Sequence, residues 1–203
     1  MAKPEKLMRT LAKLFLEKEK QGAEFKATYK RDTQHGDLFE SRFDLFYWED
    51  APVKELFEFC HAATTELVNQ LSSYTQVEFD KLKFFYHSWF HVTRNGGFQG
   101  LHFHQNASWS GIFCVDPGDR LPEAPYSGRV RFHDPRHTAY YYTDAGNKKL
   151  LPPANMGTVD IHHEAGKLLI FPSYVMHEIY PYVGERPRIV VAFNCWVKEK
   201  ETG

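Results

Sequence analysis

The sequence feature that most constrains the fold is a change of hydrophobic periodicity near residue 77. Before it, apolar side chains recur at steps of three and four residues, most clearly over 53–72, and Pro52 stands where the first turn of a helix tolerates proline. After it, β-branched and aromatic residues form short runs separated by Gly, Pro, Asn or Asp, which is typical of strands and turns. We therefore expect helices in residues 1–75 and a β core in residues 76–200.

Several short strands with such punctuation predict a sandwich or a barrel. The chain has 203 residues, of which 42% are apolar, enough to bury one substantial core. We expect a single domain over residues 1–203, mainly β, with the amino-terminal helices packed on the outer face of one sheet.

The charge pattern excludes several classes of partner. The chain has 25 basic and 26 acidic residues in a mixed distribution, so we expect neither nucleic acid nor a membrane surface as a partner. It has no apolar run near the ~20 residues of a membrane span. Its start, MAKPEKLMRTLAKLF, lacks the apolar block of a signal peptide. Three cysteines without a CxxC motif favour a reducing compartment, so we expect a cytoplasmic protein.

A His-x-His motif stands in the β-rich part, within GGFQGLHFHQNASWSG. On a strand, residues two apart point to the same face, so His102 and His104 would reach one space. A catalytic metal needs three protein ligands and keeps other positions open. The best third candidate is His177, at the start of the strand that follows Leu168–Phe171. The spacing predicts a metal site with open positions.

Three blocks carry a resemblance to a known family. They are GGFQGLHFHQNASWSGIFCV, FHDPR and GKLLIFPSYVMHEIYPYVGERPRIVVAFN. They resemble the 2-oxoglutarate/Fe(II)-dependent oxygenases, in particular small members with His-x-His, Ser-Gly, Asp-Pro-Arg, Phe-Pro-Ser and Arg…Ala-Phe-Asn in this order. The resemblance spans about residues 85–197 and leaves the amino-terminal helices outside it.

The resemblance implies a fold and a reaction. The fold is a double-stranded β-helix, the jelly roll that cupins also have, with about eight strands in two facing sheets. The enzyme would be a dioxygenase that uses Fe(II), dioxygen and the co-substrate 2-oxoglutarate to hydroxylate a small-molecule or peptide substrate.

The resemblance also implies roles for individual residues. His102, His104 and His177 would be the iron ligands, and Arg188 would bind the far carboxylate of 2-oxoglutarate. A planar guanidinium suits a bidentate carboxylate contact, and strand alternation places Arg188 and Asn194 on one face. His91 and Asn194 are candidates for further contacts with the co-substrate, and Arg186 is the alternative to Arg188.

The usual facial triad is two histidines and a carboxylate, and the carboxylate would stand where this chain has His104. Three histidines can still bind Fe(II), or Asp160, Glu164 or Glu178 could supply an oxygen ligand.

Two other functions remain open from the sequence. GGFQGLHFH also fits a cupin motif, and a cupin-type dioxygenase could use three histidines without 2-oxoglutarate. That function would leave Arg188 without a purpose. A jelly-roll binding module without catalysis is the third possibility, and it predicts that metal removal changes neither ligand binding nor stability.

Overall fold

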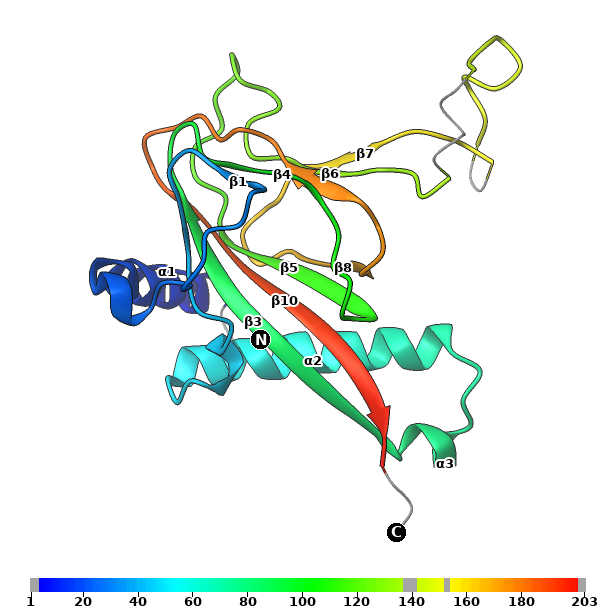
Figure 1. Ribbon diagram of the computed structural model, residues 1–203, viewed down its shortest axis with the longest axis horizontal. Helices are drawn as coiled ribbons and strands as arrows, with labels where there is room; N and C mark the ends of the chain where they lie inside the picture. Colours follow the sequence, from blue (N-terminus) through cyan, green and yellow to red (C-terminus); the bar gives the residue numbers. More distant parts are fainter. Residues whose placement is uncertain (1–3, 137–141, 152–153, 201–203) are drawn as a thin grey trace.

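The computed structural model of the protein describes residues 4–136, 142–151 and 154–200, which form two facing antiparallel sheets of five strands each (Figure 1). The sheet with the shorter strands, called the smaller sheet, has the order β1 (Gln34–His35), β4 (Phe98–His102), β9 (His177–Ile179), β6 (Val130–Phe132) and β7 (Val159–Ile161). The larger sheet has the order β2 (Leu38–Glu40), β3 (Leu82–Thr93), β10 (Arg188–Glu199), β5 (Trp109–Asp116) and β8 (Leu168–Pro172).

Two long helices cover the outer face of the larger sheet (Figure 1). They are α1 (Pro4–Lys20) and α2 (Ala51–Leu71), while α3 (Gln76–Phe79) and the 3₁₀ helices η1 (Gly22–Glu24) and η2 (Leu45–Tyr47) are short. α2 confirms the helix predicted over 53–72. The apolar stripes of both helices are buried against the sheet, and the ring of Phe15 stacks on that of Phe90 with centroids 4.4 Å apart.

The side chains of β10 alternate between two cores. Ile189, Val191 and Phe193 join the core beneath the helices, whereas Val190 joins a second cluster with residues of both sheets. Arg188 and Asn194 share the face of Val190. The predicted alternation is confirmed, and this face of β10 looks into the space between the sheets.

The fold class is the predicted one, with one addition at the amino-terminal end. Among the described residues, β3 to β10 supply eight strands after residue 76, and β1 and β2 come from the part expected to be helical. These two strands have two and three residues, too few to show a period in the sequence. The division into 1–75 and 76–200 within one domain stays a prediction. No helix in the described part of the chain is long and apolar enough to span a membrane.

Candidate metal centre

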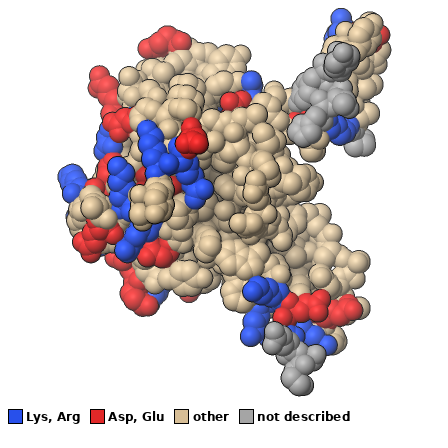
Figure 2. Space-filling view, viewed as in Figure 1, with Lys and Arg blue, Asp and Glu red and all other residues tan. Residues whose placement is uncertain are grey.

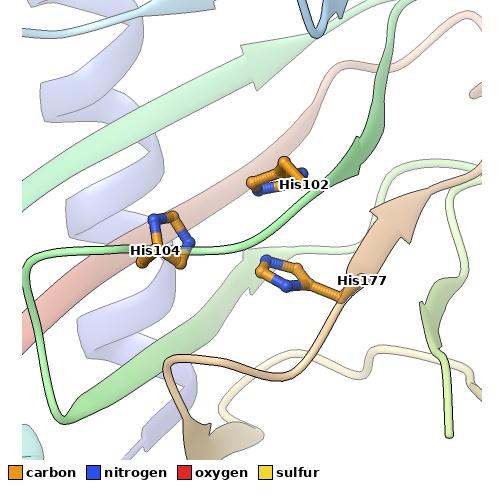
Figure 3. A group of neighbouring side chains, drawn as sticks. All are labelled: His102, His104 and His177. Carbon is orange, nitrogen blue, oxygen red and sulfur yellow. The ribbon is translucent and has the colours of Figure 1, made fainter. Parts of the chain in front are cut away.

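Three histidine rings meet between the two sheets (Figure 3). His102 ends β4, His177 begins β9, and the two residues are direct partners in the strand ladder. Their ring centroids are 4.1 Å apart, and that of His104 lies 5.2 and 5.3 Å from them. One ligand nitrogen of each ring lies within 4.8 Å of the others. Nitrogens bound about 2.1 Å from one metal in a tetrahedral or facial arrangement are roughly 3.0–3.4 Å apart, so the three rings would move closer together when they bind one ion.

His104 reaches this cluster by a different route from the one predicted. The prediction that both histidines lie on one strand is wrong, because β4 ends at His102. The backbone N–H of His104 instead donates a hydrogen bond to the carbonyl of Ser173, at 3.0 Å. Strand alternation therefore does not set the direction of the His104 ring.

Hydrogen bonds fix which ring nitrogen of His102 and His177 is free. Nδ1 of His102 lies 2.7 Å from the carbonyl oxygen of Gly100, and Nδ1 of His177 lies 3.0 Å from that of Val175. A carbonyl only accepts, so each Nδ1 carries the proton and each Nε2 keeps a free lone pair. This is the tautomer that binds a metal through Nε2.

Burial also keeps these rings neutral. Desolvation, followed by repulsion from His102 when that ring is also protonated, lowers the pKa of His104 to about 3. Desolvation lowers the pKa of His177 to about 2 and shifts the pKa of His102 downward. All three imidazoles are therefore uncharged at neutral pH, the form that a metal requires.

Arg188 is a buried cation at the start of β10. Its side chain is 2% exposed, and its Nη2 has no hydrogen-bond partner among the described residues. Desolvation by burial lowers the pKa of this guanidinium. The turn at Gly128, with φ of 61°, approaches so closely that a Cβ there would lie 3.0 Å from Cδ of Arg188. A buried and incompletely paired cation is costly without an anion, so this residue fits a carboxylate ligand.

His91 and Asn194, the two residues predicted to contact the co-substrate, lie within hydrogen-bond distance of other side chains of the protein. His91 is buried, and its Nε2 lies 2.8 Å from Oε2 of Glu40 and 3.1 Å from Nε1 of Trp89. Asn194 lies beside His104 and Ser110. Sequence reasoning missed Glu40, a 3% exposed carboxylate, although a charge in the aromatic stretch DLFESRF was the available signal.

The alternative oxygen ligands lie with other partners. Asp160 binds Arg131 at 2.7 Å, Glu178 lies 3.0 Å from a ring nitrogen of His133, and Glu164 lies 4.0 Å from Arg120. None belongs to the cluster of potential ligands found in the described residues.

The alternative to Arg188 is exposed. Arg186 binds Asp116 at 2.7 Å, and its side chain is 61% exposed. An exposed cation that already pairs with a carboxylate is stable without a further anionic ligand. Arg186 therefore differs from Arg188, whose guanidinium is buried.

A large cavity of about 920 Å³ opens beside His102 and His104. We call it the mouth cavity, and its aromatic walls are Phe43, Trp89, Phe103 and Trp196. Arg31, Asp32 and Glu40 add charged groups of both signs. The cavity is large enough for a substrate next to the three histidines.

Comparisons with known proteins give a family model and several solved structures. A family model described as "Putative 2OG-Fe(II) oxygenase" matches residues 87–194. A search of curated proteins gives no match.

Solved structures show the same fold. A prolyl-4-hydroxylase from Pseudomonas putida has a TM-score of 0.62 and 17% identity, covering 94% of this chain and 87% of that one. A prolyl hydroxylase from Trichoplax adhaerens has a TM-score of 0.60 and 9% identity, covering 94% and 78%. The epimerase SnoN from nogalamycin biosynthesis has a TM-score of 0.60 and 13% identity, covering 100% and 79%.

These structural likenesses confirm the predicted double-stranded β-helix. The family model covers more than half of the chain, including the His-x-His motif and the distal histidine. The family uses Fe(II) and 2-oxoglutarate, as the sequence predicted. The chain therefore belongs to the 2-oxoglutarate/Fe(II)-dependent oxygenases.

Proposed function

We propose that His102, His104 and His177 hold the ferrous ion of this oxygenase and that Arg188 binds the distal carboxylate of 2-oxoglutarate. One pair of observations supports the assignment above others. Three neutral imidazoles meet between the sheets, and Arg188, a buried guanidinium whose Nη2 has no partner among the described residues, lies on the same face of β10 as Val190, which packs between the sheets. When bound, the ion supplies dioxygen activation coupled to the decarboxylation of 2-oxoglutarate to succinate.

The residues of the chain have distinct tasks in this scheme. The Gly100 and Val175 carbonyls keep the Nε2 atoms of two ligands free of protons. Arg188 holds one end of the co-substrate and fixes its orientation. A dianionic co-substrate offsets the positive charge that three neutral ligands leave uncompensated. The aromatic walls of the mouth cavity limit the access of water to the reacting groups.

The substrate is a small molecule or a peptide side chain that enters through the mouth cavity. The fold serves both kinds of ligand among its neighbours, since one is a prolyl hydroxylase bound to a peptide fragment and another an epimerase of nogalamycin biosynthesis. On the face shown in Figure 2, Lys and Arg lie among Asp and Glu. This mixture supports the proposal that nucleic acid is not the partner.

We also propose a cytoplasmic location. All three cysteines, Cys60, Cys114 and Cys195, are free and buried, and this usage fits a reducing compartment.

Turnover without a substrate tests the proposed function. We expect the purified protein to convert 2-oxoglutarate slowly to succinate only when Fe(II) and dioxygen are present, and to stop when a chelator removes the metal. Succinate measured by mass spectrometry gives the readout, with Zn²⁺ in place of Fe(II) as the matched control. A cupin-type dioxygenase predicts no succinate under any of these conditions, and that result would reject the proposal.

A further inference from the structure

His104 differs from the other two proposed ligands in how its ring is held. His102 and His177 face each other across a strand ladder, and a backbone carbonyl two residues earlier accepts from each Nδ1. His104 lies beyond the end of β4. Its Nδ1 meets a side chain, the amide of Asn194, at 3.3 Å.

That amide belongs to a closed loop of hydrogen bonds around His104. The backbone N–H of His104 donates to the carbonyl of Ser173, and the hydroxyls of Ser173 and Ser110 lie 2.7 Å apart. Oγ of Ser110 lies 2.9 Å from Oδ1 of Asn194, whose Nδ2 faces the His104 ring. Both serines are 1% exposed. The loop therefore ties the backbone of His104 to its ring through two buried hydroxyls.

The strand register builds this loop. Ser110 on β5 and Asn194 on β10 are direct ladder partners, and Ser173 directly follows β8, the other neighbour of β5. Ser173 also donates its N–H to the carbonyl of Ser108. Asn194 is thus held by the larger sheet, whereas His104 belongs to the connection between β4 and β5.

The orientation of the amide decides the tautomer of His104. With Nδ2 toward Nδ1, the ring nitrogen accepts, so the proton of the neutral ring lies on Nε2 and blocks a metal there. A half-turn of the amide places Oδ1 toward Nδ1. In that arrangement Nδ1–H donates to Oδ1, Nδ2 donates to Ser110, and the lone pair of Nε2 is free.

We propose that Asn194 is a positioning residue that holds His104 in the metal-binding tautomer, with its Oδ1 accepting from Nδ1–H when the metal is bound. Ser110 accepts from Nδ2 and keeps the amide in this orientation. The inference rests on the proposed ligand set. It replaces the expected contact of Asn194 with the co-substrate by a contact with a ligand.

Metal affinity of the whole protein tests this role without any turnover. We expect Asn194→Leu to weaken Co(II) binding by about 10- to 100-fold, the range for lost partners of ligand histidines. Asn194→Asp keeps an acceptor oxygen and restores the affinity to within a few-fold of wild type. Asn69→Leu on the exposed side of α2 is the matched control and leaves the affinity unchanged. Circular dichroism checks that each variant is folded.

Proton NMR of the Co(II)-loaded protein separates the tautomer from charge and packing. The wild type should show three shifted, water-exchangeable ring N–H signals, one for each ligand. Asn194→Leu should lose one of them, Asn194→Asp should keep all three, and Ser110→Ala should broaden the same signal. The inference would be overturned if Asn194→Leu kept all three signals and the wild-type Co(II) affinity. It would also be overturned if Asn194→Asp bound Co(II) no more tightly than Asn194→Leu. If His102→Ala binds Co(II) like the wild type, the ligand set itself is wrong.

Discussion

Replacing His177 or His102 with alanine is expected to abolish succinate formation from 2-oxoglutarate and to weaken Fe(II) binding by more than about 100-fold. The loss should exceed the ~10- to 100-fold effect of an outer hydrogen-bond partner, because the variant removes one of three direct ligands. The two rings face each other across the β4–β9 ladder, so the two variants should fail alike. Anaerobic calorimetry with Fe(II) and mass spectrometry of succinate measure the two effects.

A histidine outside the cluster provides the control for this prediction. His61 lies on α2 and hydrogen-bonds the hydroxyl of Tyr86 at 2.9 Å. We expect His61→Ala to retain the Fe(II) affinity of the wild type. If His177→Ala binds Fe(II) as tightly as His61→Ala does, the proposed ligand set is wrong.

Arg188→Ala is expected to raise the KM for 2-oxoglutarate by about 100-fold or more. A buried carboxylate that loses its charged partner costs about 3–5 kcal/mol, and the Arg188 side chain is 2% exposed. Arg188→Lys should recover only part of the affinity, because lysine keeps the positive charge but cannot make the bidentate contact of a guanidinium. Succinate formation at increasing concentrations of 2-oxoglutarate measures the effect.

Two comparisons keep this second prediction specific. Arg188→Met preserves much of the apolar stem and should behave like the alanine variant, which separates lost charge from lost packing. Fe(II) affinity in the absence of 2-oxoglutarate should stay near that of the wild type in all three variants. An unchanged KM in Arg188→Ala would mean that another residue binds the co-substrate.

Periodicity and motif order predict the main elements of this fold. The helical spacing around Leu56 and the apolar runs after residue 77 depend on neighbours close in sequence, so α2 and the long strands could be recognised. β1 and β2 could not, because two or three residues carry no period and their pairing with β4 and β3 is a long-range contact.

The site shows the same division between local and long-range information. The ligand candidates are recognisable because His102, His104 and His177 stand in ordered motifs. Strand alternation predicted the direction of the His104 ring. In the structure this ring lies outside the strand and contacts Asn194, which is 90 residues away in the sequence. The Ser110–Ser173 contact spans 63 residues and depends on strand register, which no local pattern contains.

Glu40 illustrates a further limit. Its carboxylate is buried against His91 from a strand of three residues. Desolvation by burial opposes its ionisation, but the hydrogen bond and charge of His91, with help from Gln34 and Arg31, hold its pKa below the usual value. A single glutamate in the sequence cannot reveal partners that β3 and the turn at residues 31–34 supply.

The most direct test of the central claim is an anaerobic titration of the purified protein with Fe(II) and then with 2-oxoglutarate, followed by visible absorption. We expect a weak charge-transfer band that appears only when Fe(II) and 2-oxoglutarate are both present, saturates at one equivalent of each, and is absent from His177→Ala. A wild-type protein that binds Fe(II) but develops no band with saturating 2-oxoglutarate would contradict the central claim.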